Sequence, residues 1–210
     1  MTDVNPPRRR RATQARSKAT VQKILDTTTA LIVERGAQGV TMSEIARRAD
    51  LVIGSLYQYF TDRSAIYRAI LIRHNAEART LLHHFVSEAR TLDEFIGALN
   101  ALFDSYFELL QRDRLVIGLW EIVQTDPQLM ALDVEDSLQN ARFIARVSAP
   151  MLPGIEEARL VAANALLIQY SLYAGRIARE LPPEIASEVP ALYKSMLSQL
   201  FRQTLAPKQT

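Results

Sequence analysis

The sequence has no cysteine and no long apolar run, and these absences exclude several functions. Without cysteine among its 210 residues, the chain can form no disulfide framework, no thiolate nucleophile and no thiolate metal site. No apolar run approaches the roughly 18 residues that cross a bilayer, so we expect no transmembrane helix. Residues 1–18 include basic residues but no apolar stretch, which argues against a secretory signal. We therefore expect a cytoplasmic protein.

The motifs of several enzyme classes are also missing. There is no G-x-S-x-G nucleophile motif, no H-E-x-x-H zinc motif and no phosphate-binding loop. Asp133, Glu135 and Asp136 form an acidic cluster, but no cationic partner lies near them in the sequence. We interpret the cluster as a solvated helix face and expect no enzymatic activity.

The three histidines do not indicate a metal site. His74, His83 and His84 fall on one predicted helix, where His83 and His84 point about 100° apart. They cannot bind one metal ion without ligands from another helix. We expect one histidine in the interior, another in solvent, and neither a metal nor another cofactor.

Charge is distributed unevenly between the two ends of the chain. Residues 1–73 contain 13 Lys and Arg against 6 Asp and Glu, a net charge of +7, whereas residues 74–210 contain 12 against 17, a net charge of −5. A basic segment of this kind indicates a polyanionic partner such as nucleic acid. A solvated basic tail is the alternative, because Arg8–Arg11 supply four of the positive charges.

Apolar residues recur at helical spacing throughout the chain, and strict alternation is absent. We predict an all-α fold of about nine helices. Thr41 and Glu44, like Thr91 and Glu94, have the spacing of a capping box, Thr61 can cap a helix beginning near Asp62, and Asp126-Pro127 is a further start signal. The expected helices span about 18–35, 42–49, 53–60, 62–90, 92–110, 115–124, 127–148, 155–181 and 190–205.

Two short helices joined by a three- or four-residue turn, at about 41–60, describe a helix-turn-helix. In the second helix, Leu56 and Phe60 can anchor the backbone. The remaining side chains, Ser55, Tyr57, Gln58 and Tyr59, can then reach phosphate oxygens and base edges. The alternative is that both tyrosines are core aromatics.

At this point the sequence resembles the DNA-binding domain of TetR-family regulators. The resemblance runs from Thr41-Met42-Ser43-Glu44-Ile45-Ala46 to Leu56-Tyr57-Gln58-Tyr59-Phe60 and on through Arg63 to Ile66, within residues 18–73. It implies a DNA-binding domain at 18–73 and a helical effector-binding and dimerisation domain at 74–210, and we expect the basic residues before it to form a flexible arm at 1–17.

The resemblance and the chemistry of the segment together give a set of expected DNA-binding residues. These are Thr41, Ser43, Arg47, Ile53, Gly54, Ser55, Tyr57, Gln58, Tyr59 and Arg63. Two positions depart from the family pattern. Val52 replaces the usual capping Ser or Thr, which puts the start of the recognition helix in question, and Arg63 replaces the usual lysine.

The resemblance also implies a small hydrophobic or aromatic effector. Helix 95–110 is apolar on more than one face, which suits a helix between a core and a cavity. We expect Phe103, Tyr106, Phe107, Trp120, Phe143 and Tyr173 to contact the effector, with Asn140, Arg142 and Gln169 able to orient it.

The expected protein is thus a homodimeric repressor of a palindromic operator, dimerising through helices 155–181 and 190–205 without any membrane partner. Two alternatives stay open, namely an activator and a helical effector-binding protein without sequence-specific DNA binding. The segment Arg8–Arg11 could enter the minor groove or add only nonspecific affinity.

Overall fold

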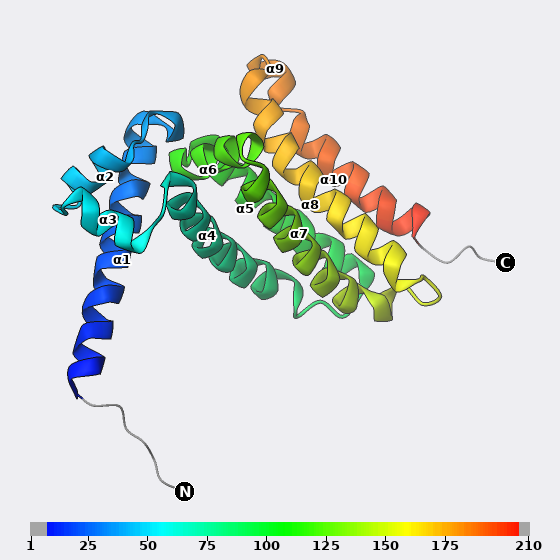
Figure 1. Ribbon diagram of the computed structural model, residues 1–210. Coiled ribbons are helices and arrows are strands. Elements are labelled where there is room, and N and C mark those ends of the chain that lie inside the picture. Colours follow the sequence, from blue (N-terminus) through cyan, green and yellow to red (C-terminus); the bar gives the residue numbers. More distant parts are fainter. Residues whose placement is uncertain (1–7, 206–210) are drawn as a thin grey trace, which may run out of the picture.

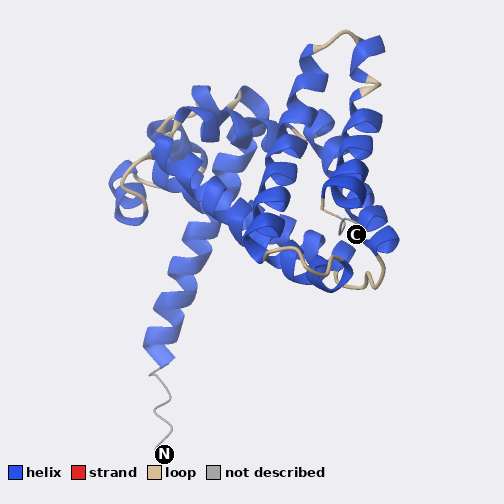
Figure 2. Cartoon of the chain, turned by 90° about the vertical axis from the view of Figure 1, so that its right-hand side faces the viewer, coloured by secondary structure: helices blue, strands red, loops and turns tan. Residues whose placement is uncertain are grey.

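The computed structural model describes residues 8–205, and in that range the chain is helical and contains no strand (Figures 1 and 2). The all-α prediction is therefore confirmed. Within these residues, no helix is both long and apolar enough to cross a bilayer. The α-helices are α1 (Arg8–Arg35), α2 (Met42–Arg48), α3 (Ile53–Tyr59), α4 (Arg63–Val86), α5 (Leu92–Arg112), α6 (Arg114–Thr125), α7 (Pro127–Ser148), α8 (Glu157–Glu180), the single turn α9 (Pro183–Ala186) and α10 (Val189–Gln199).

Three short segments complete the structure: the 3₁₀ turns Ala37–Gly39 and Ala149–Met151, and a π-helical turn, Leu200–Thr204, that extends α10.

Helix α1 begins earlier than predicted. The sequence analysis started this helix near Lys18 and treated residues 1–17 as a flexible arm, but the helix extends back to Arg8. The expectation is wrong for residues 8–17, because no Pro or Gly lies between Pro7 and Gly36 and the segment is rich in Arg, Ala, Gln and Lys, which favour helices. Residues 1–7 of the expected arm lie outside the described residues.

Several helix starts follow from the predicted capping signals. Thr91 and Glu94 form both halves of a capping box at the start of α5. Asp126 accepts hydrogen bonds from the backbone amides at the start of α7, and Pro127 occupies the first helical position. The prediction for α4 is wrong by one residue, because the N-cap is Asp62 rather than Thr61; the Asp62 carboxylate reaches the Ala65 amide at 2.8 Å.

The first hydrophobic core joins the helix-turn-helix to part of the larger domain. It packs Ile24 and Leu31 of α1, Ile45 of α2, Leu56 of α3 and Ile66 of α4. Helix α6 completes the same core with Leu119, Ile122 and Val123. The N-terminal three-helix unit therefore packs directly on α6.

The second core lies between the C-terminal half of α4 and helices α5, α7, α8 and α10. Its fully buried members include Val86, Phe95, Leu160 and Phe201. Helix α4 contributes to both cores, and in Figure 1 it runs from the helix-turn-helix toward the loop before α5. It is the direct physical connection between the two parts of the chain.

Candidate DNA-binding surface and ligand cavity

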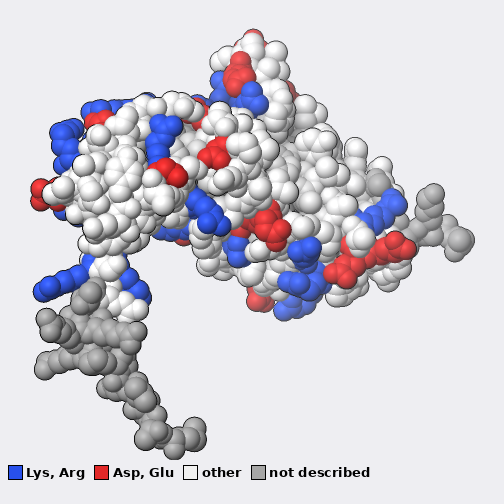
Figure 3. Space-filling view, in the orientation of Figure 1, with Lys and Arg blue, Asp and Glu red and all other residues white. Residues whose placement is uncertain are grey.

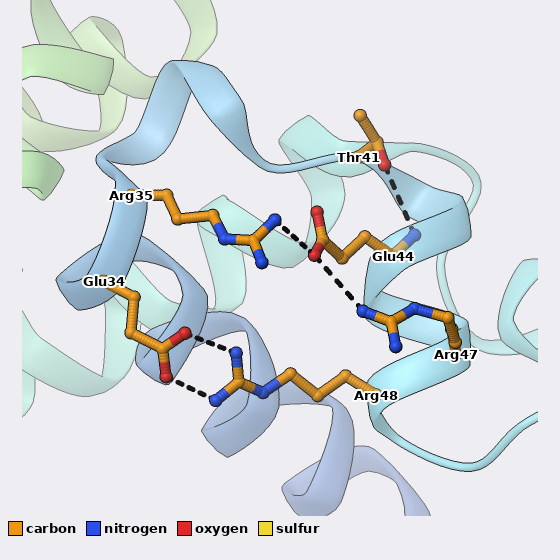
Figure 4. Close-up of polar contacts among 6 residues, drawn as sticks. All are labelled: Glu34, Arg35, Thr41, Glu44, Arg47 and Arg48. Carbon is orange, nitrogen blue, oxygen red and sulfur yellow. Dashed lines mark hydrogen bonds and ion pairs between the residues drawn. The ribbon is translucent and has the colours of Figure 1, made fainter.

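Glu44 fixes α2 against α1 (Figure 4). The Thr41 hydroxyl accepts a hydrogen bond from the Glu44 amide at 3.3 Å, as the capping-box spacing predicts. The Glu44 carboxylate, however, is hydrogen-bonded by Arg35 of α1 and Arg47 of α2. The reciprocal half of the predicted box is therefore wrong, because the guanidinium groups compete for the carboxylate that would otherwise bond the Thr41 amide.

Arg47 and Arg48 have different surroundings. Arg48 forms a two-pronged ion pair with Glu34 of α1, and this pairing lowers the pKa of the Glu34 carboxyl (Figure 4). The side chain of Arg47 is 73% exposed and meets Glu44 only at 3.5 Å. Arg47 is therefore the arginine of this pair that can reach an external phosphate.

The turn between α2 and α3 places Asp50 in the left-handed region, at φ 52°. Asp tolerates this conformation better than most residues because its short polar side chain can bond locally. After the turn, Val52 is the N-cap residue of α3, although valine has no polar side-chain atom with which to cap. The amide of Ser55 bonds the Val52 carbonyl at 2.8 Å, so the helix starts through its backbone alone.

Helix α3 has one buried anchor and a broad exposed face. Leu56 is fully buried, whereas Tyr57 is 52% and Tyr59 is 36% exposed. The interpretation of these tyrosines as buried core aromatics is therefore wrong. Gln58 and Gly54 are exposed as well, and Ser55 is partly exposed.

The remaining expected contact residues divide into two groups. Thr41, Ser43 and Ile53 are exposed next to this face. Arg63 is partly buried and donates hydrogen bonds to the carbonyls of Val40, at 2.8 Å, and Gln38, at 3.3 Å. It therefore holds the loop before α2 in addition to any contact with DNA.

Positive charge gathers on the same part of the molecule. In Figure 3, Lys and Arg side chains lie along α1 and at the outer edge of the lobe formed by α1 to α3. Asp and Glu side chains lie among them at this outer edge, so the positive charge there is interspersed with negative charge.

A cavity of about 140 Å³ lies in the larger domain. Its walls come from five helices: α4, α5, α7, α8 and α10. Apolar side chains dominate the lining, and the polar residues His74, Asn75, Tyr106, Asp133, Asp136, Ser137, Asn140, Asn164, Ser171 and Tyr193 complete it.

Two of the six expected effector-binding residues line this cavity, namely Phe103 and Tyr106. Asn140, expected to orient a ligand, lines it too. Gln169 reaches its edge by donating a hydrogen bond to Ser137 at 2.8 Å.

The other four expected residues lie elsewhere. Phe143 stacks on His83, with ring centroids 3.7 Å apart, and Phe107 packs against Phe103. Trp120 and Tyr173 both contact the guanidinium of Arg176, at 4.9 Å and 5.5 Å from their ring centroids. The sequence analysis selected bulky aromatics, but these four rings pack against other side chains and do not line the cavity.

The acidic cluster was misinterpreted. Asp133 and Asp136 line the cavity, and Asp136 has a cationic partner in Arg79 of α4. Glu135, between them, is exposed. The spacing of Asp133, Asp136 and Asn140 on one helical face could have indicated a shared direction, but Arg79 is too far away in sequence to be recognised.

Burial changes the titration of three cavity residues. It raises the pKa of Asp133, where Asp136 adds a smaller effect in the same direction, and it raises that of Tyr106. It lowers the pKa of His74, against the influence of nearby carboxylates. His84 is exposed, so one histidine lies inside and another outside, as expected. Among the described residues, no group of three or more His, Cys, Asp or Glu side chains could hold a metal ion.

The first 70 residues carry a family signature. Residues 24–70 match the family described as bacterial regulatory proteins, tetR family. The N-terminal domain therefore carries the signature of the TetR-family DNA-binding domain. The matched segment holds α2, α3 and the start of α4, so it contains the helix-turn-helix of a DNA-binding transcription regulator.

Solved structures extend the likeness to the whole fold. A TetR-family regulator from Pectobacterium atrosepticum has a TM-score of 0.68 and 16% identity, over 93% of this chain and 98% of that one. SmeT, the repressor of the Stenotrophomonas maltophilia multidrug efflux pump SmeDEF, gives 0.65 and 20%, over 90% and 94%. FadR from Bacillus subtilis, in complex with stearoyl-CoA, gives 0.64 and 16%, over 86% and 97%. At these sequence identities, the structural similarity is evidence for a shared fold alone. No curated protein matches the sequence.

Proposed function

We propose that this TetR-family chain is a repressor that binds a palindromic operator as a homodimer and is released by a small molecule. The observation that carries the proposal is the exposed face of α3, where Tyr57 and Tyr59 point outward beside a buried Leu56. Exposed hydrogen-bonding aromatics on a recognition helix have no role in the core and suit phosphates and base edges. SmeT, with the same fold, is a repressor.

The DNA contacts that we propose come from both helices of the motif and the start of α4. Arg47 and Ser43 on α2 would meet phosphates, together with Thr41. Ile53, Gly54, Ser55, Tyr57, Gln58 and Tyr59 of α3 would meet the major groove, with Arg63 bracing the loop before α2.

An exposed apolar stripe supports dimerisation. Leu166, Tyr170 and Tyr173 recur at intervals of four and three along α8, and all are at least half exposed. Leu192 and Met196 are exposed on α10, which packs beside α8 (Figure 1). A two-fold axis through these helices would form a four-helix interface and place two α3 helices to read half-sites about 34–36 Å apart or slightly more.

Helix α4 supports the proposed release mechanism. Its N-terminal half contributes Ile66 and Ile70 to the core beneath α3, and its C-terminal half contributes Asn75 and Leu82 to the cavity. A ligand that moves the cavity wall would tilt α4 and change the spacing of the two recognition helices. The FadR complex is one neighbour of this fold that holds a ligand. TetR regulators are typically not enzymes, and the proposed mechanism uses binding alone.

Selection of bound duplexes from a random pool tests this function. We expect an inverted repeat whose affinity falls at least about tenfold with Tyr57→Ala, since loss of one good base or phosphate contact costs about 1–3 kcal/mol. Leu109→Ala, exposed on α5 away from the motif, is the matched control and should bind normally. Selection of no common sequence would instead favour an effector-binding protein without sequence-specific DNA binding.

The oligomeric state tests the interface. Leu166→Glu and Met196→Glu each place a charge in the proposed apolar contact and should convert the dimer to a monomer in light scattering. Ile72→Glu, an exposed apolar position on α4, should leave the dimer intact. A dimer that persists in both interface variants would refute this arrangement.

A further inference from the structure

The cavity presents many hydrogen-bond acceptors and little positive charge. Among the described residues that line it there is no Lys or Arg. Burial disfavours the charge of His74 by lowering its pKa. Two carboxylates, Asp133 and Asp136, face this space together with the amide of Asn140.

The two carboxylates have unequal partners. Asp136 is paired with Arg79 and accepts a further hydrogen bond from the Asn140 amide nitrogen at 3.0 Å. Among the described residues, the Asp133 carboxylate accepts a side-chain hydrogen bond only from the neutral amide of Gln169, at 3.5 Å. The cavity therefore holds one carboxylate whose charge is balanced and one whose charge is not.

Asn140, a second polar residue of the cavity wall, has a side-chain acceptor that receives no hydrogen bond from residues 8–205. The side-chain oxygen of Asn140 is fully buried and has no hydrogen-bond partner among the described residues. The Asn140 amide nitrogen already donates a hydrogen bond to Asp136. The amide oxygen can therefore accept a hydrogen bond only from some other group. Buried acceptors without donors are costly, and a ligand that donates hydrogen bonds would satisfy this one.

Apolar side chains form a large part of the remaining wall. Leu82, Leu99, Phe103, Ile144 and Ile168 are among its wall residues. A void of about 140 Å³ is similar to the roughly 150 Å³ apolar cavity that holds benzene. A body of about one ring would fit before the wall adjusts.

We propose that the cavity binds a small amphipathic amine, with its ammonium group at Asp133 and its apolar body against the leucine and phenylalanine wall. This inference rests on the proposed effector-binding function and specifies its ligand class. An ammonium group donates hydrogen bonds to the Asp133 carboxylate and balances its charge. A carboxylate of the same size would face like charge.

Three ligands of matched shape test the charge preference. Benzylamine is a cation at neutral pH, benzyl alcohol is neutral and benzoate is an anion. In calorimetric titrations of the full-length protein, we expect benzylamine to bind at least about tenfold more tightly than benzyl alcohol, as for a buried charged hydrogen bond, and benzoate to bind weakest. Equal binding of the three, tighter binding of benzoate, or no binding of benzylamine at millimolar concentration would overturn the proposal.

Matched variants assign the preference to the carboxylate. Asp133→Asn preserves the shape of the side chain and should remove the advantage of benzylamine over benzyl alcohol. Glu135→Gln makes the same charge change at an exposed position of the same helix and should leave it unchanged. Retention of the amine preference in Asp133→Asn would overturn the assignment.

A separate operator-release assay distinguishes this inference from the proposed function. Amine binding that leaves DNA affinity unchanged would contradict the effector role but support the ligand class. Release by a compound that is neither an amine nor dependent on Asp133 would support the function and contradict the ligand class.

Discussion

The hydroxyl of Ser64, in the first turn of α4, donates a hydrogen bond of 2.5 Å to the carboxylate of Asp126, the N-cap of α7. The same carboxylate accepts bonds from the amides of Gln128 and Leu129. The contact with Ser64 is the largest of several effects that lower the pKa of Asp126. One side chain thus joins the helix that leaves the DNA-binding motif to a helix that lines the ligand cavity.

Ser64→Ala should reduce the free energy of unfolding by about 1 kcal/mol, the usual net value of one such hydrogen bond. Chemical denaturation measures this directly. Thr80→Ala is the matched control on α4, since its hydroxyl bonds only the carbonyl of its own helix, at Ala76. An equal or larger loss in Thr80→Ala would mean that the link between helices contributes nothing of its own.

Substitution of Gly54 should change the stability of the protein and its affinity for DNA in opposite directions. A Cβ atom at this position would meet nothing within 4 Å, and the residue lies in the first turn of α3. Gly54→Ala should therefore stabilise the free protein by up to about 1 kcal/mol through helix propensity, while weakening operator binding because the added methyl lies on the proposed DNA face. A variant that melts higher and binds DNA as tightly as the parent would remove Gly54 from the interface.

The junction between α1 and α6 is sensitive to a single methyl group. A Cβ atom on Gly118 would lie 2.6 Å from the Cγ2 of Ile32, a buried residue of α1. Gly118→Ala should lower the free energy of unfolding by about 1–3 kcal/mol, as overpacking does. Gly97→Ala, where the methyl meets nothing within 4 Å, should instead be neutral or stabilising. Thermal melts that rank the two variants the other way would contradict the close approach of α1 and α6.

The buried carboxylate of Asp133 makes a pH-dependent contribution to stability. Its pKa is raised above the ordinary 3.8 in the folded state, so folding is penalised once the pH exceeds the unfolded value and most fully above the folded value. Asp133→Asn should therefore be more stable than the parent at neutral pH, and this gain should vanish below about pH 4. A variant that is less stable at pH 7 would show that the charge is compensated in the folded protein.

Local signals predicted the helices well and the cavity poorly. Thr91 with Glu94, and Asp126 with Pro127, are neighbours in sequence, so their capping function could be derived from spacing alone. The exposed Tyr57 followed from the four-residue spacing of its anchors Leu56 and Phe60.

The errors concern partners that are distant in sequence. The Glu44 carboxylate accepts a hydrogen bond from Arg35 on another helix and does not complete the predicted capping box. Asp136 forms an ion pair with Arg79, which is 57 residues away in the sequence. Trp120 was expected in the cavity because of its size, but Arg176 holds it elsewhere. Such pairings depend on how helices cross, which periodicity does not specify.

The most direct test of the central claim is fluorescence anisotropy with labelled DNA from upstream of the gene and an unrelated duplex, each across a salt series. The account predicts tight binding to the upstream duplex, at least about tenfold weaker binding by Tyr57→Ala, and a salt slope reduced by about one in Arg47→Ala. Arg112→Ala, which removes the same charge from the exposed end of α5, should behave as the parent. Equal, salt-dependent binding of both duplexes by the parent protein and Tyr57→Ala would contradict recognition through α3.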